Sequence, residues 1–397
     1  MTFLHHPFHF FQVSDGTGQT VDHRFLILVD MAVGMLDAVG VQIGVILFSY
    51  LPTSSECFGY CIVFFCTLQA PRGDDLEPPV HLAHILPGGD FMAIVQTDVP
   101  ITSAENQRVI RQLVQTYPFL RTEVLTSTAF QRPVSTLVIG NGPRKVLFSA
   151  SHHANEWITT LVLLKFAEEF AQAIQSNGSI NNRNARELAE TVTIYMVPMV
   201  DPDGVDLVAG AIQEGNIQYD LAKRLSEDYP AIPFPDGWKA NLLGVDLNLQ
   251  YPAGWLRARE IKFTQGFTLP GPRDYVGRAP LNQFESRALA GYTEYLDPAL
   301  VIALHSQGRE IYWQFMDIPV PGAEELGRKM AQASGYALAD TPYASGFAGY
   351  KDWFIQRFRR PGYTVEVGEG TNPLPLEQFE TIYREVLPIL VIGAAGE

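Results

Sequence analysis

The segment VLFSASHHANEWITT, residues 146–160, joins a short apolar run to a long amphipathic pattern through a polar turn. Val146–Ser149 predicts a buried strand, and Glu156–Ile174 has the apolar spacing of a helix. The turn between them holds His152 and His153. In α/β proteins, functional side chains gather beyond the C-terminal ends of the strands. The segment therefore predicts a strand-to-helix turn that carries a functional site.

The same alternation of short apolar runs and helical patterns continues from about Val95 to the C-terminus. Further strands are expected at Val134–Ile139, Val192–Val197, Val301–Leu304 and Tyr363–Val367, and further helices at Ser103–Tyr117 (with Ser103 as N-cap), Glu285–Leu296, Ala323–Ser334 and Leu376–Ile392. The turn Gly140–Pro143 separates two of the apolar runs and predicts a hairpin. This alternation predicts an α/β fold with a mostly parallel or mixed sheet covered on both faces.

Composition excludes several kinds of partner. The chain has 397 residues and a formal net charge of -15. Nucleic acids and anionic lipid surfaces need basic protein surfaces, so neither is an expected partner. The three cysteines, Cys57, Cys61 and Cys66, have spacings that match no common zinc pattern, and we expect buried free thiols.

Residues 1–94 differ in character from the rest. They hold no lysine, and the apolar stretch 25–51 is interrupted by Asp30 and Asp37. A membrane anchor is therefore not expected, and the N-terminus lacks the basic start of a secretory signal. Residues 71–79 (PRGDDLEPP) read as a linker. Residues 95–397 are expected to form the main folded domain, and either a cytoplasmic or an exported location fits this sequence.

The histidines after residue 90 indicate a metal site. They are His152, His153 and His305, and each follows a predicted strand. His153 and Glu156 are three residues apart and can face one point, and His305 could supply a third zinc ligand. His152 is the alternative ligand, although its spacing to Glu156 fits less well. The structural alternative is a Glu156 that favours the helix dipole beside a locally satisfied His153.

Six motifs occur along the chain in a fixed order. They are SHHANEW at 151–157, DPDG at 201–204, WKAN at 238–241, GVDLN at 244–248, HSQGR at 305–309 and TVEVG at 364–368. In this order the chain resembles the zinc carboxypeptidases. Within that family the phrases WKANLLGVDLNLQYPAGW, GPRDYVG, AGYKDWF and VEVGEGTNPLP resemble the bacterial γ-D-glutamyl-L-diamino acid peptidases, which cut peptidoglycan stem peptides.

The resemblance implies a fold and a set of roles. The implied fold is a single α/β domain with a twisted mixed sheet of about eight strands and helices on both faces. One Zn²⁺ per chain would be held by His153, Glu156 and His305. Glu366 would be the general base. Asp246 would orient a ligand histidine, and Asn248 would bind substrate.

Other site positions depart from the family pattern. Lys239 stands where the family has an arginine that polarises the scissile carbonyl, and a lysine supplies the charge without a bidentate fork. Tyr343 lies near the position of a mobile substrate-binding tyrosine, with Tyr350 as the rival.

The arginines that grip a C-terminal carboxylate in the family are replaced by Leu249 and Asn155. Their loss argues against ordinary carboxypeptidase activity, because the bidentate fork is missing. Arg309, four residues after His305, is the expected replacement, and a structural salt bridge is its alternative.

We therefore expect a zinc metallopeptidase that hydrolyses the γ-D-glutamyl-diaminopimelate amide bond of peptidoglycan peptides. The alternatives are a zinc carboxypeptidase or amidase of the same fold with another substrate, and a non-catalytic binder of wall peptides. The oligomeric state is left open by the sequence.

Overall fold

The computed structural model describes residues 43–49, 60–66 and 93–397. The chain divides into two compact units, with the boundary between Gly89 and Asp90. In the first unit, β1 (Ile43–Ser49) and β2 (Tyr60–Cys66) form an antiparallel pair in which Ile43 lies opposite Cys66.

Several predictions fall on parts of the first unit that the structure does not describe. The linker at 71–79, the burial of the cysteine side chains and most of the apolar stretch 25–51 are among them. Within the described ranges, no helix has both the length and the apolarity needed to cross a membrane.

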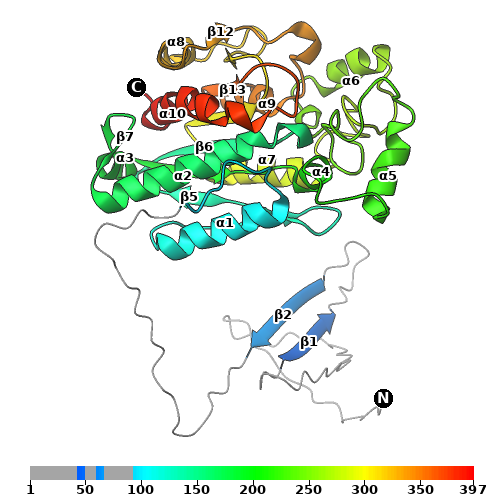
Figure 1. Ribbon diagram of the computed structural model, residues 1–397, viewed down its shortest axis with the longest axis horizontal. Coiled ribbons are helices and arrows are strands. Elements are labelled where there is room, and N and C mark those ends of the chain that lie inside the picture. The colour runs from blue at the N-terminus through cyan, green and yellow to red at the C-terminus, as the bar shows by residue number, and fades with distance from the viewer. Residues whose placement is uncertain (1–42, 50–59, 67–92) are drawn as a thin grey trace, which may run out of the picture. The chain divides into compact units, whose positions relative to one another are not determined.

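The second unit is built on one mixed sheet (Figure 1), which matches the predicted fold class. Seven strands lie side by side in the order β12-β11-β13-β10-β6-β9-β5, close to the eight expected. They are β5 (Leu137–Ile139), β6 (Arg144–Ala150), β9 (Val192–Val197), β10 (Leu300–His305), β11 (Glu310–Tyr312), β12 (Ala337–Ala339) and β13 (Gly362–Glu366). Strands β13, β10, β6 and β9 are parallel to one another. β5 runs antiparallel to β9, and β11 runs antiparallel to β13 but parallel to β12.

Helices cover both faces of this sheet. The helices of the described ranges are α1 (Ser103–Thr116), α2 (Ile158–Ser176), α3 (Ala185–Thr191), α4 (Pro202–Val208), α5 (Ile217–Ser226), α6 (Trp255–Thr264), α7 (Phe284–Leu296), α8 (Ala323–Ser334), α9 (Tyr350–Phe358) and α10 (Phe379–Ala395). Helices α1, α2, α8 and α10 share a core cluster with one face, and α7 and α9 with the other. Two small antiparallel pairs, β3 (Val124–Ser127) with β4 (Pro133–Ser135) and β7 (Ser179–Ile180) with β8 (Arg183–Asn184), lie outside the main sheet.

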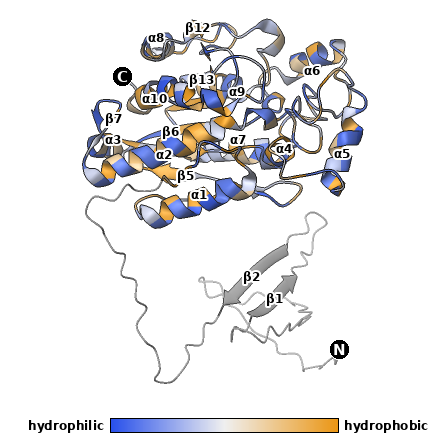
Figure 2. Ribbon diagram, viewed as in Figure 1, coloured by the Kyte–Doolittle hydropathy of each residue, from blue (hydrophilic) through white to orange (hydrophobic). Residues whose placement is uncertain are grey.

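The two-residue period of the strands divides the core into two layers. Val146 and Phe148 of β6 join the cluster packed against α1, α2 and α10, whereas Leu147 joins the cluster with α7 and α9. The first seven residues of helix α2 are all buried, and its charged residues come later in the helix (Figure 2). The continuous apolar runs of the central strands follow from this burial on both faces.

The predicted hairpin around Gly140–Pro143 is wrong. Strands β5 and β6 do not pair with each other, because β9 lies between them and pairs with both. The glycines serve close packing against the start of β9. A Cβ atom on Gly140 would lie 2.2 Å from the carbonyl oxygen of Val192, so only glycine fits there.

The N-cap of α1 is Thr102 and not Ser103. The Thr102 side chain accepts a hydrogen bond from the backbone N–H of Glu105. Ser103 instead binds a carboxylate 103 residues away, because both its N–H and its hydroxyl donate to Asp206 at 2.7 Å. Helix α1 is thereby attached to α4.

Arg132 completes this attachment. Its guanidinium pairs with Asp206 and, at 2.8 Å, with Asp203, and both carboxylates are buried. Replacing Arg132 by alanine is expected to lower the free energy of unfolding by about 3–5 kcal/mol, because two buried carboxylates lose their cation. Urea denaturation measures this change. The control is Arg328→Ala, which removes an exposed pair with Glu324 and should change stability little. Equal effects of the two substitutions would contradict the interpretation.

Candidate active site

The ends of three adjacent parallel strands bring together residues that are far apart in the sequence. His305 is the last residue of β10 and lies in register with Glu366, the last residue of β13. β6 pairs with the other edge of β10 and ends at Ala150, three residues before His153. The polar side chains therefore meet at the C-terminal edge of the sheet, as the sequence predicts.

Hydrogen bonds within the turn after β6 fix the direction of its side chains. Ser151 has a left-handed backbone (φ 47°), and its N–H donates to Thr159 Oγ1 at 3.0 Å. Thr159 in turn donates to the carbonyl of Glu156 at 2.7 Å. A short 3₁₀ helix, η1 (Ala154–Glu156), follows the turn, so Glu156 begins no regular α-helix, contrary to the prediction. Helix α2 starts two residues later.

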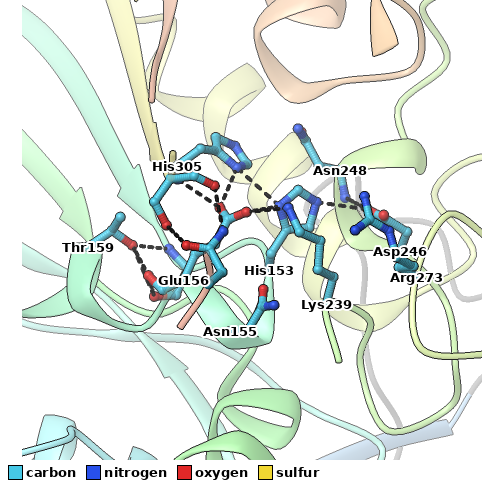
Figure 3. A network of polar contacts seen from close by, with 12 residues as sticks. His153, Asn155, Glu156, Thr159, Lys239, Asp246, Asn248, Arg273 and His305 are labelled. Carbon is cyan, nitrogen blue, oxygen red and sulfur yellow. Dashed lines mark hydrogen bonds and ion pairs between the residues drawn. The ribbon is translucent and has the colours of Figure 1, made fainter. Parts of the chain in front are cut away.

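The side chains of His153, Glu156 and His305 converge on one point (Figure 3). The Nδ1 atom of His153 lies 2.9 Å from Glu156 Oε1, and that of His305 lies 3.0 Å from Glu156 Oε2. The two Nδ1 atoms are 3.3 Å apart. Two imidazole nitrogens and a carboxylate are therefore arranged as a set that could hold one cation.

The carboxylate of Glu156 is surrounded by groups that stabilise its negative charge. Lys239 Nζ lies 2.6 Å from its Oε1, and the backbone N–H of Ser306 donates to Oε2 at 3.2 Å. Burial opposes the charge, but Lys239 and His153 outweigh it and hold the pKa of Glu156 well below its usual range. Burial likewise opposes the charge of Lys239, and Glu156 raises its pKa.

Asp246 holds His153 from the other side. Its Oδ1 lies 3.0 Å from His153 Nε2 and also accepts the N–H of Asn248 at 3.1 Å. Burial disfavours a charge on His153, yet the carboxylates of Glu156 and Asp246 raise its pKa to about 9. Each ring nitrogen of His153 thus contacts a different carboxylate, Glu156 or Asp246, and the two contacts fix the orientation of the ring.

His152 is directed away from the convergent donors. It is fully buried, its Nε2 lies 3.3 Å from the Tyr251 hydroxyl, and its ring stacks on that of His305. Burial lowers its pKa well below the ordinary value and keeps the ring neutral. The structure therefore favours His153 over His152 as the candidate ligand.

A pocket of about 160 Å³ opens beside these residues. Its lining includes Lys239, Asn248, Leu249 and Glu366. Burial, and then the negative charge of Glu156, raise the pKa of Glu366 to about 8. The predicted base and the predicted carbonyl-polarising lysine thus share the pocket with His153, Glu156 and His305.

Three predicted substrate contacts lie elsewhere. Arg309 does not line the pocket; its Nη2 bonds Glu385 at 2.9 Å, so the salt-bridge alternative describes its placement. Tyr343 is 62% exposed, and its hydroxyl accepts a hydrogen bond from Arg257 at 2.8 Å. Tyr350 is buried and bonds Thr293. Asn155 is buried as well, and its amide donates to the carbonyl of Asp236 at 3.0 Å.

Sequence reasoning gave no role to several charged residues that line the pocket. They are Lys262, Arg273, Asp274, Lys351 and Asp352. Arg273 and Asp274 lie in the GPRDYVG phrase, and Lys351 and Asp352 in AGYKDWF. The sequence signal that could have indicated their place in the pocket is the occurrence of charged residues within two phrases otherwise rich in glycine and aromatic residues.

Comparisons with known proteins agree with this geometry. The chain is 40% identical over 284 residues to the gamma-D-glutamyl-L-diamino acid endopeptidase 1 of Lysinibacillus sphaericus, covering 72% of this chain and 69% of that protein. It is 35% identical over 286 residues to the uncharacterized protein YqgT of Bacillus subtilis strain 168, covering 72% and 74%. The carboxypeptidase A structure from Helicoverpa armigera shares the fold, with a TM-score of 0.57 at 18% identity over 76% of this chain and 74% of that one.

The model of one protein family, described as zinc carboxypeptidase, matches residues 107–388. This range contains the convergent histidines and glutamate, the pocket-lining Lys239 and Glu366, and all seven strands of the main sheet. The chain belongs to the zinc carboxypeptidase family.

Proposed function

We propose that residues 95–397 form a zinc-dependent peptidase that hydrolyses the γ-D-glutamyl-diaminopimelate bond of peptidoglycan peptides. The observation that carries the proposal is the convergence of His153, Glu156 and His305 beside Glu366 in one pocket. The name of the Lysinibacillus relative, which is 40% identical, supports the choice of bond.

The donor geometry fits one zinc ion per chain. Tetrahedral zinc with ligand distances of ~2.0–2.1 Å separates its ligand atoms by about 3.3 Å. The two Nδ1 atoms are 3.3 Å apart, and each lies 2.9–3.0 Å from a Glu156 oxygen. Two histidines and one glutamate form a set that catalytic zinc uses, with a position left for water or substrate. His153, Glu156 and His305 would therefore hold the ion.

The chain's own residues would carry the proton transfers. Zinc, when bound, supplies Lewis acidity that polarises a carbonyl and makes water more acidic. Glu366 lines the pocket beside the three proposed ligands, where its carboxylate can take the proton from the attacking water and pass it to the leaving nitrogen. Lys239 places an ammonium in the pocket that can stabilise the developing negative charge on the carbonyl oxygen. Asp246 keeps His153 in its ligating orientation.

The pocket is poorly suited to ordinary C-terminal residues. Leu249 lines it where the family places a carboxylate-gripping arginine, and the Asn155 amide is engaged by the backbone of Asp236. An apolar side chain cannot bind a carboxylate, so these two positions do not supply the grip on a peptide C-terminus that the family's arginines provide.

Hydrolysis of L-Ala-γ-D-Glu-diaminopimelate by the zinc-loaded protein tests the proposal. Mass spectrometry should detect release of diaminopimelate, a chelator should abolish it, and added zinc should restore it. Glu366→Gln should lower kcat by about 10²–10⁴-fold because the proton acceptor is removed. The α-linked isomer of the peptide is the control substrate. A zinc-loaded protein that leaves the γ-linked peptide intact would refute the substrate assignment.

Asp246→Ala is expected to weaken zinc binding by about 10–100-fold, because the ring of His153 loses the partner that orients it. Competition with a chromogenic chelator measures the affinity. Glu260→Ala, at an exposed carboxylate paired with Arg257, is the control and should bind zinc as tightly as the unaltered protein. Unchanged zinc affinity in Asp246→Ala would remove the orienting role.

Lys239→Met is expected to lower kcat by about 10²–10³-fold with a smaller change in KM, because the positive charge acts on the transition state. Lys239→Arg should recover part of the loss, and zinc content must be equal in all three proteins. An increase in KM at constant kcat would instead assign Lys239 to substrate binding.

A further inference from the structure

One wall of the pocket carries two cations on a single carboxylate. Lys262 Nζ lies 2.6 Å from Asp274 Oδ1, and Arg273 Nε lies 2.6 Å from Asp274 Oδ2. All three residues line the pocket, and we call them the Arg273 cluster. Two positive charges share one negative charge, so the cluster has a net positive charge.

The Arg273 cluster is fastened to the catalytic group by the backbone. The N–H of Asp274 donates to Asp246 Oδ2 at 3.2 Å, and the other oxygen of Asp246 contacts His153. The carbonyl of Pro272 accepts the N–H of Lys239 at 2.7 Å. Figure 3 shows Arg273 on the Asp246 side of His153. The backbone on both sides of Arg273 is therefore attached to Asp246 and to Lys239, and the guanidinium is held through Nε by Asp274.

Arg273 retains free hydrogen-bonding capacity. A guanidinium has five N–H donors, and Asp274 engages the one on Nε. Neither terminal nitrogen has a hydrogen-bond partner within the ranges that the structure describes. The side chain is 41% exposed and lines the pocket. Its two terminal nitrogens can therefore donate a pair of hydrogen bonds to one carboxylate in bidentate geometry.

The other pocket-lining cations are already engaged. Lys351 is 3% exposed, donates to the carbonyl of Gln314 at 2.6 Å and pairs with Asp352. Lys239 pairs with Glu156, and Lys262 with Asp274. Outside the pocket, Arg309 is held by Glu385. Among these cations, Arg273 alone has a pair of guanidinium N–H groups available for a carboxylate. Leu249 and Asn155, which stand where the family has arginines, have no such pair.

We propose that Arg273 binds a carboxylate of the substrate, with Asp274 and Lys262 as the residues that position it. The identity of the peptide rests on the proposed function. A γ-linked D-glutamate keeps a free α-carboxylate near the scissile bond, and the diamino acid carries further carboxylates. Both are the same ligand chemistry, and amidation of each in turn distinguishes them.

The test measures, by calorimetry, the binding of peptides to the zinc-loaded Glu366→Gln protein. This variant is used so that turnover does not interfere with the binding measurement. The ligands are L-Ala-γ-D-Glu-diaminopimelate, the same peptide with the glutamate α-carboxylate amidated, and a third with the diaminopimelate carboxylates amidated. We expect one of the two amidations to weaken binding about 10–100-fold, because a charge-assisted bidentate contact is lost. The amidation that does so identifies the bound carboxylate.

Adding Arg273→Met, which keeps the apolar stem, should make charged and amidated peptides bind equally. Adding Arg273→Lys should keep part of the preference, because the charge remains and the fork is lost. Arg278→Ala, at an exposed arginine five residues further on that does not line the pocket, is the matched control and should keep the full preference. Equal zinc content and circular dichroism spectra show that the variants are folded.

The proposal is overturned if the Glu366→Gln protein does not prefer the charged peptide over either amidated one. It is also overturned if the preference survives in Arg273→Met. Cleavage by the unaltered protein is a separate measurement. Cleavage with a preference that does not depend on Arg273 leaves the proposed function standing and removes this inference. Arg273-dependent binding without cleavage supports this inference and contradicts the proposed function.

Discussion

The buried carboxylate of Glu156 is the group on which the geometry of the site depends. A carboxylate that is 1% exposed is costly unless its charge is balanced, since it has lost its hydration. The balancing groups come from separate parts of the chain: His153 from the turn after β6, Lys239 from the loop before η2 (Leu247–Leu249), and His305 and Ser306 from the end of β10. Each segment must arrive at its place for Glu156 to be tolerated.

The sheet makes this arrangement possible because it is buried on both sides. Alternate residues of β6 and β10 enter different apolar layers, so neither strand can shift its register by one residue without exposing a layer. Fixed register places His305 beside Glu366 at the same edge. The apolar core thus determines the distances among polar groups that lie just beyond it.

Electrostatics adds a second constraint within the pocket. Both acidic and basic side chains line it, and Lys239, Lys262 and Lys351 each pair with a carboxylate. Such pairing limits which cation can bind a substrate carboxylate, because each paired carboxylate offsets the charge of its ammonium. A guanidinium can serve one carboxylate through Nε and another through its terminal nitrogens, which an ammonium cannot do in a planar arrangement. Leu249 and Asn155 stand where the family pattern has arginines, and Arg273 is the side chain that we propose to bind the carboxylate instead.

Local patterns in the sequence were enough to predict the strand-turn-helix unit around His153, the α/β class, and the helices α1, α7, α8 and α10. They also predicted that His153, Glu156 and His305 follow strand ends, and the family resemblance implied that the three form one ligand set. These features follow from periodicities of two and 3.6 residues and from strand ends meeting at one edge, which are properties of short segments. The order of strands was decided only by tertiary structure. Insertion of β9 between β5 and β6 replaced the predicted hairpin, since pairing depends on which distant strand buries the same surface. Tertiary packing also determines that Arg309 pairs with Glu385 and that Arg273 lines the pocket. A side chain's partner depends on the position of chain far away in sequence, and no local pattern contains that position.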